Sequence, residues 1–326
     1  MLEISGTGWR IWALRSQSGS NKGGRLTKRP RGQIVSTGIG MVLVFAACGG
    51  GSDPSEPAAT GQVPVASGSG SVASSPDAVT GEIDGLFEVE DGRSLFLRCT
   101  GEGSPTVILE GGDGDTTGSY GFAESTLAAE TRTCVYDRAN LGMSDPAPGP
   151  RELDDLVGDL ESLLREARVE PPYVLVGTSG GGYISAGYAY RHADDIAGMV
   201  FIDTGAPFRN PPPPVVEETT WNDPSNVELR DYLQVEKDGW NGRQEIGDIP
   251  VSVVTVKYSP SDIEAAQFAS ERAGMRDNVE DQQGWLVLSP QAEQIVVHTG
   301  HAVEEEDPQF VIDVILGVLE AARQQA

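Results

Sequence analysis

The sequence predicts an α/β fold with a mostly parallel, doubly wound sheet. Short apolar, β-branched runs alternate with stretches of helical periodicity from about residue 81 onward. One of these runs leads directly into a serine flanked by glycines, Ser179. The alternation breaks only once, between residues 205 and 248, where a proline run interrupts it. These observations predict one main domain, residues 81–326.

The expected strands and helices of this domain can be assigned from the sequence pattern. Residues 86–90 and 94–99 read as a hairpin around the turn pair Asp91-Gly92. Leucines and valines at helical spacing predict an amphipathic helix over residues 153–164, and Asp307-Pro308 begins a last helix. Further apolar runs predict strands at residues 106–110, 133–136, 173–177, 199–202, 251–256 and 294–297.

Ser179 is the strongest candidate for a functional residue. The apolar run from Tyr173 delivers it into a turn, and Gly177 and Gly180 permit a backbone that projects its Oγ outward. A bare Gly-x-Ser-x-Gly pattern is weak in a chain with 41 glycines, where it also describes a flexible turn. The strand before it and the helical segment at residues 183–191 favour a nucleophile.

A serine nucleophile needs a base, and the chain has three histidines. His192 follows the helix that leads away from Ser179, so we expect it to mark that helix's exposed end. His301 lies in a glycine-bearing loop just beyond the last strand and is the favoured base, with His298 as the alternative. Three histidines at these spacings form no zinc pattern.

The acid that orients the base stays open between two carboxylates. In chain order it should fall between Ser179 and His301. The usual position, after the later strand, favours Asp262, with Glu264 close behind it. Asp203 ends the strand that follows the serine's helix and is the alternative.

The oxyanion of an acyl-transfer intermediate needs two N–H donors. Gly180, directly after the nucleophile, supplies one candidate. The glycine-rich loop after residues 106–110 supplies the other, and we favour the backbone N–H of Asp113. The Asp113 carboxylate must then point away from the oxyanion, because a negative charge beside it would oppose catalysis.

Taken together, these motifs resemble the α/β-hydrolase fold family across about residues 83–323. The resemblance implies an eight-stranded sheet, a Ser-acid-His triad and no cofactor. The family often has His-Gly where Gly111-Gly112 stand, and Asn140 replaces a common glycine. The matching segments are Glu110-Gly111-Gly112, Tyr136 to Ser144, Gly177 to Gly181, Gly300-His301 and Glu306-Asp307-Pro308.

The resemblance also implies a disulfide. The strand order of the family places the second strand beside the fourth. Cys99 ends the second strand here and Cys134 lies on the fourth. A disulfide between them fits a protein exported from the cytoplasm.

The N-terminal region reads as an export signal. Basic residues precede a short apolar stretch, residues 34–47, which ends at Cys48. This pattern resembles a bacterial lipoprotein signal that would be lipidated at Cys48, although the family prefers leucine where Phe45 stands. An ordinary secretory signal is the alternative. We therefore expect residues 1–48 to target the protein and residues 49–80, rich in Gly, Ser and Pro, to form a flexible tether.

The net charge of the chain limits the classes of molecule that it can bind. The whole chain has a formal net charge of -26, which argues against nucleic acid and leaves the N-terminal anchor as the only membrane contact. We expect residues 205–248 to form a small cap over Ser179.

The sequence therefore predicts a serine hydrolase outside the cytoplasm, tethered to the cell membrane or secreted. A carboxylic ester of a small molecule is the expected substrate, because an alkoxide leaves easily. An amidase or peptidase, a lactonase, and a non-catalytic ligand-binding lipoprotein of the same fold are the alternatives.

Overall fold

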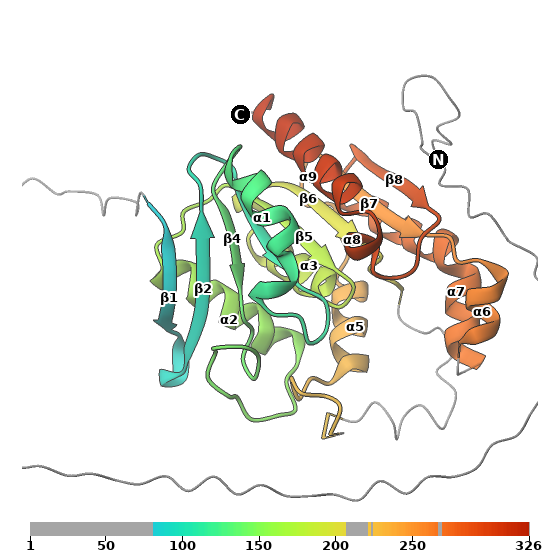
Figure 1. Cartoon of the computed structure of the whole chain (residues 1–326), viewed down its shortest axis with the longest axis horizontal. Helices are drawn as coiled ribbons and strands as arrows, with labels where there is room; N and C mark the ends of the chain where they lie inside the picture. Colours follow the sequence, from blue (N-terminus) through green and yellow to red (C-terminus); the bar gives the residue numbers. More distant parts are fainter. Residues whose placement is uncertain (1–80, 207–220, 223, 267–268, 326) are drawn as a thin grey trace, which may run out of the picture. The chain divides into compact units, whose positions relative to one another are not determined.

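The computed structural model describes residues 81–206, 221–222, 224–266 and 269–325. These residues contain an eight-stranded sheet with the strand order β1-β2-β4-β3-β5-β6-β7-β8 (Figure 1). β1 pairs with β2, and β2 with β4, in antiparallel fashion, and all the other neighbours are parallel. The strands are β1 (Ile83–Glu88), β2 (Ser94–Thr100), β3 (Thr106–Glu110), β4 (Thr133–Tyr136), β5 (Tyr173–Thr178), β6 (Ile196–Ile202), β7 (Val251–Val256) and β8 (Ala292–Val297).

The central strands are continuous apolar runs because both of their faces are covered. Every residue of β3, β4, β5 and β7 is buried. Helices α2 (Leu153–Glu166) and α3 (Gly181–Arg191) pack on one face of the sheet. Helices α1 (Gly121–Ala128) and α9 (Pro308–Arg323) pack on the other face (Figure 1). The predicted doubly wound architecture is confirmed.

Shorter or more polar α-helices in the described residues are α5 (Tyr232–Asn241), α6 (Pro260–Ala265), α7 (Ala269–Asp281) and α8 (Val303–Glu306). α5 lies within the segment expected to form a cap and contacts α3. α6 and α7 follow β7, and α7 packs against that strand. None of the described helices is long and apolar enough to cross a bilayer.

Cys99 and Cys134 form a disulfide, as the family resemblance implies. The two residues stand directly opposite each other in the antiparallel pair of β2 and β4, with 4.0 Å between their Cα atoms. Both side chains are completely buried.

Several predictions from the sequence concern residues outside the described ranges. These are the targeting segment 1–48 with Cys48, the tether 49–80 and residues 207–220 of the expected cap. They stay predictions, as do the domain limits drawn from them.

Candidate active site

Ser179 occupies the turn between β5 and α3. Its φ is 48°, a left-handed conformation that non-glycine residues adopt rarely. The turn is so tight that a Cβ on Gly177 would lie 2.5 Å from the Cα of Gly182. The backbone N–H of Ser179 donates to the carbonyl of Ile202 on the neighbouring strand, at 2.9 Å. Small neighbours and this anchor hold the serine at the carboxyl end of the sheet.

His301 reaches Ser179 from the loop after β8. Its Nε2 lies 2.8 Å from the Oγ of Ser179, so a hydrogen bond joins the favoured base to the serine. His298, by contrast, lines a separate hollow together with Asp262. His192 caps the end of α3, as expected, and its Nε2 hydrogen-bonds Glu161 at 2.9 Å.

Asp203 is the carboxylate that meets the histidine. It follows β6 with a φ of 45°, and its Oδ2 lies 2.7 Å from the Nδ1 of His301. The hydroxyl of Tyr258 donates to the same oxygen at 2.5 Å. The other oxygen, Oδ1, accepts hydrogen bonds from the side chains of Asn278 and Gln282 and from the Val256 N–H, at 2.8 to 3.1 Å. Five donors therefore fix this buried carboxylate in place.

Asp262, which the sequence slightly favoured as this acid, lies elsewhere. It is the third residue of α6, where its carboxylate and the Ser259 hydroxyl form a reciprocal capping box. Tyr258 precedes this cap and is the residue after β7 that points to the histidine, 3.3 Å from its Nδ1. The expectation for Asp262 is therefore wrong. The Asp262 side chain caps α6, and Asp203 is the carboxylate that contacts His301.

Asp203 and His301 each shift the pKa of the other. Burial alone would raise the pKa of Asp203, but the hydrogen bond and charge of His301, with hydrogen bonds from Tyr258 and Asn278, hold the pKa below its ordinary value. The hydrogen bond to Asp203 raises the pKa of His301, although desolvation opposes this shift. An imidazolium formed at this position is therefore stabilised by the carboxylate.

The loop after β3, residues 111–115, was expected to supply the second oxyanion donor. This donor loop lies against the serine. A Cβ on Gly112 would be 3.5 Å from the Cβ of Ser179. Gly112 N–H donates to Asp115 at 2.8 Å, and Gly114 N–H donates to Glu228 at 2.7 Å. Between them, the N–H of Asp113 meets no hydrogen-bond acceptor within the described residues, and neither does the N–H of Gly180. Both predicted donors are thus free to bind an oxyanion.

Comparison with known proteins identifies the fold. A family model described as the alpha/beta hydrolase fold matches residues 105–233. A thermophilic esterase from Thermogutta terrifontis has a similar structure, with a TM-score of 0.57 at 18% identity, over 74% of this chain and 99% of that one. The chain has the alpha/beta hydrolase fold.

Two curated relatives are similar in sequence. The uncharacterized protein YqjL of Bacillus subtilis (strain 168) is 28% identical over 233 residues, which is 69% of this chain and 88% of YqjL. A protein named probable transporter efuK, from Hormonema carpetanum, is 32% identical over 145 residues. That match covers 42% of this chain but spans only 21% of the relative.

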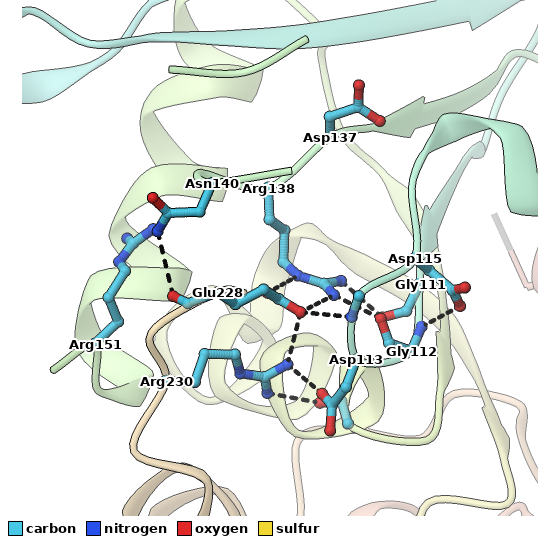
Figure 2. Close-up of polar contacts among 12 residues, drawn as sticks. Gly111, Gly112, Asp113, Asp115, Asp137, Arg138, Asn140, Arg151, Glu228 and Arg230 are labelled. Atoms are coloured by element: carbon cyan, nitrogen blue, oxygen red, sulfur yellow. Dashed lines mark hydrogen bonds and ion pairs between the residues drawn. The ribbon is translucent and has the colours of Figure 1, made fainter. Parts of the chain in front are cut away.

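A buried network of charges supports the donor loop of this alpha/beta hydrolase fold (Figure 2). The guanidinium of Arg138 donates to the carbonyls of Gly111 and Gly112 at 2.7 and 2.6 Å. The same group pairs with Glu110 and Glu228, each at 2.7 Å. Burial alone would raise the pKa of Glu228, but the charge and hydrogen bonds of Arg138 outweigh it and lower the pKa to about 2. Glu228 therefore stays ionised at neutral pH.

Asn140 belongs to the same region and explains one departure from the family pattern. Its φ is 73°, so the position needs the left-handed conformation for which the family uses glycine. The Asn140 Oδ1 accepts from Ala147 N–H at 3.0 Å, and its Nδ2 donates to the carbonyl of Glu228 at 3.3 Å. Asparagine tolerates this conformation and adds two hydrogen bonds.

A pocket of about 410 Å³ opens above the serine. Its lining includes several carboxylates besides that of Asp203, namely Asp113, Glu236, Glu271 and Asp281. Burial, reinforced by repulsion from Asp113, raises the pKa of Glu236 to about 7. The pocket has the size of a small-molecule site. Within the described residues, no group of three or more His, Cys, Asp or Glu side chains is arranged to hold a metal ion.

Sequence reasoning missed the residues that support the site from distant segments. Tyr258, Asn278 and Gln282 hold Asp203, while Glu228 and Arg230 meet the donor loop. Only Arg138 carried a signal, because it lies in the Tyr136–Ser144 motif on which the family resemblance partly rests. The others lie in segments without a recognisable pattern.

Proposed function

We propose that this protein is a serine hydrolase that cleaves a carboxylic ester of a small molecule through an acyl-enzyme on Ser179. The observation that carries the proposal is the hydrogen-bonded chain from Ser179 Oγ to His301 at 2.8 Å and from His301 to Asp203 at 2.7 Å. A hydroxyl, a base and an orienting acid in this order match the arrangement that activates serine.

The proposed reaction has two halves. His301 Nε2 takes the proton of Ser179 as its Oγ bonds to the ester carbon, and the N–H groups of Gly180 and Asp113 hold the oxyanion. The imidazolium then returns the proton to the alkoxide as the carbon–oxygen bond breaks and the alcohol leaves. A water molecule, deprotonated by His301, attacks the acyl-enzyme in the same way and releases the acid.

An ester is preferred over an amide because its alkoxide leaving group needs less protonation by the imidazolium than the nitrogen leaving group of an amide does. Amidase or peptidase and lactonase activities use the same residues and stay alternatives. The esterase whose structure is similar is only 18% identical, so it supports the fold and not a substrate.

Turnover of a short p-nitrophenyl ester tests the proposal. The wild-type protein is expected to release p-nitrophenol, and Ser179→Ala to lower kcat by at least about 10⁴-fold, with unchanged circular dichroism. Ser261→Ala, on the exposed α6, is a matched control that should keep full activity. Retained turnover in Ser179→Ala would mean that another group is the nucleophile.

We also propose that the protein works outside the cytoplasm, held to the membrane by lipid on Cys48. The buried disulfide of β2 and β4 supports an oxidising compartment. The net charge of -26 supports a small-molecule partner rather than nucleic acid. Cys48→Ser should release the protein from membranes and abolish metabolic labelling with a fatty acid. Labelling that persists in Cys48→Ser would contradict lipidation at this position.

A further inference from the structure

The donor loop carries a charge that is unfavourable for the proposed reaction. A Cβ on Gly180 would lie 2.0 Å from the Oδ1 of Asp113, so the Asp113 carboxylate presses against the residue after the nucleophile. The negative charge of this group therefore lies close to both proposed oxyanion donors and lines the pocket above Ser179, so the expectation that this carboxylate points away from the oxyanion is wrong. Left alone, this carboxylate would repel the negative charge that develops on the intermediate.

Arg230 counters this charge directly. Its Nη1 forms an ion pair with Asp113 Oδ1 (Figure 2). Its Nη2 lies 3.4 Å from the carbonyl oxygen of Gly180. One guanidinium thus bridges the two segments that provide the free N–H groups. The Arg230 side chain is 1% exposed and that of Asp113 is 38% exposed, so water screens the pair from the Asp113 side but does not reach the guanidinium.

The surrounding residues fix Arg230 in this position. Asn226 holds its backbone, donating to the Arg230 carbonyl at 2.8 Å and accepting from its N–H at 3.2 Å. Glu228, two residues before it, binds the Gly114 N–H and lies 3.7 Å from the Arg230 guanidinium. Two residues of the expected cap, Glu228 and Arg230, therefore contact the donor loop at adjacent points.

We propose that Arg230 is a positioning residue for the oxyanion site: it neutralises Asp113 and holds the Asp113 and Gly180 backbones so that their N–H groups converge. This proposal rests on the proposed hydrolase function. Two consequences follow. Loss of Arg230 should slow the chemical step more than it weakens substrate binding, and removal of the Asp113 charge should relieve that loss.

A double-mutant cycle tests this, with Asp113→Asn, Arg230→Met and the double variant. Asp113→Asn keeps the backbone N–H and removes the charge that Arg230 neutralises, so its kcat is the reference against which the double variant is read. Arg230→Met should lower kcat by about 30- to 100-fold with KM within about threefold, comparable to weakening one oxyanion donor. The double variant should recover at least about tenfold of that loss, because the uncompensated charge is gone.

A transition-state analogue provides a second readout. An alkylboronic acid bonds to the serine oxygen and forms a negatively charged tetrahedral adduct. Its affinity should fall in Arg230→Met in proportion to kcat and return in the double variant. A residue that only stabilises the fold would not restore this affinity when Asp113 is changed.

Arg151→Met is the matched control. Arg151 is equally buried, pairs with Asp159 at 2.6 Å and lies beside Arg230 in a short β-bridge, with no contact to the donor loop among the described residues. It should lower the unfolding midpoint and leave kcat unchanged. If it lowers kcat as much as Arg230→Met does, general destabilisation explains both and the proposal is overturned.

Other outcomes are equally decisive. An unchanged kcat in Arg230→Met, or a double variant as slow as Arg230→Met, overturns the proposal while the hydrolase function stands. A wild-type protein with no turnover overturns both. If Arg230→Met does not fold, Arg230→Lys and the double variant carry the test. Each should keep kcat within about tenfold of wild type, and a loss above a hundredfold in either overturns the proposal.

Discussion

At the scale of single residues, the two ends of the hydrogen-bonded chain share an uncommon backbone. Ser179 and Asp203 both have positive φ values, 48° and 45°. Flanking glycines revealed the strained serine in the sequence, because they allow the tight turn. Nothing comparable marks Asp203, and the choice between it and Asp262 depended on which strand end faces His301. Such a choice is set by tertiary contacts, so residue type and order left it open.

Asp203→Asn should change both the rate and its pH dependence. The hydrogen bond to Asp203 raises the pKa of His301, and the reaction needs the neutral imidazole. In the wild type, kcat/KM should therefore rise with pH through a pKa above the ordinary histidine value of about 6.5. Without the carboxylate charge the imidazolium is less stable, so this rise should move to lower pH. The maximal kcat should fall on the order of 10³-fold.

Asp262→Asn is the control for this prediction, since its side chain caps α6 and leaves His301 untouched. Its pH profile should match that of the wild type. A shifted profile in Asp262→Asn together with an unshifted one in Asp203→Asn would show that the acid has been assigned to the wrong residue.

At the scale of helices and strands, the elements that could be predicted were those with a continuous or periodic apolar pattern. The buried strands β3, β5 and β7 and the amphipathic helices α2 and α9 were all predicted, because burial on a sheet requires continuous or periodic apolar residues. α7 was missed. Its residues, Ala269–Asp281, are mostly polar, and it is tied to the site through hydrogen bonds such as that of Asn278 to Asp203. Polar anchoring of this kind leaves no periodic signal.

Glu228→Gln should destabilise the protein in a pH-dependent way. Removing one partner of a buried ion pair costs about 3 kcal/mol in free energy of unfolding. The pKa of Glu228 is lowered from 4.5 to about 2, so its charge stabilises the fold above pH 4.5. That contribution is lost as the pH falls toward 2. Urea denaturation at pH 7 and at pH 3 should therefore show a larger difference from wild type at pH 7.

Glu161→Gln serves as the comparison, because this carboxylate pairs with Arg191 at a partly exposed site. Its effect should stay within about 1 kcal/mol at either pH. Equal effects of the two substitutions at pH 7 would argue against a tightly coupled Glu228.

At the scale of the whole molecule, the site is assembled from segments far apart in the chain. Ser179 and His301 are 122 residues apart, and Arg230 meets Asp113 across 117 residues. The family resemblance predicted that Ser179 and His301 lie close together, because the strand order of the fold brings the loops that carry them to one edge of the sheet. The second contact involves Arg230, inside the segment 205–248 that was expected to form a cap, and this segment follows no shared pattern. The sequence could therefore predict the serine, the histidine and two candidate carboxylates, but not the buried charges that support them.

The charge of the molecule should restrict its substrates. The chain carries a net charge of -26, and carboxylates such as Glu271 and Asp281 line the pocket. An ester with a carboxylate on its acyl chain should therefore have kcat/KM at least about tenfold below that of a neutral ester of equal length. Added salt should narrow the gap, because it screens the repulsion. Steady-state kinetics at low and high ionic strength measures both effects. Equal rates for the two esters at low salt would contradict the prediction.

The most direct measurement of the central claim is covalent labelling with a fluorophosphonate, followed by mass spectrometry of the digested protein. A serine activated by an imidazole attacks phosphorus and displaces fluoride, which leaves a stable adduct. The wild-type protein should carry one phosphonyl group on the peptide containing Ser179, and His301→Ala should carry none. Absence of labelling in the folded wild-type protein, or labelling at a different residue, would contradict activation of Ser179 by His301.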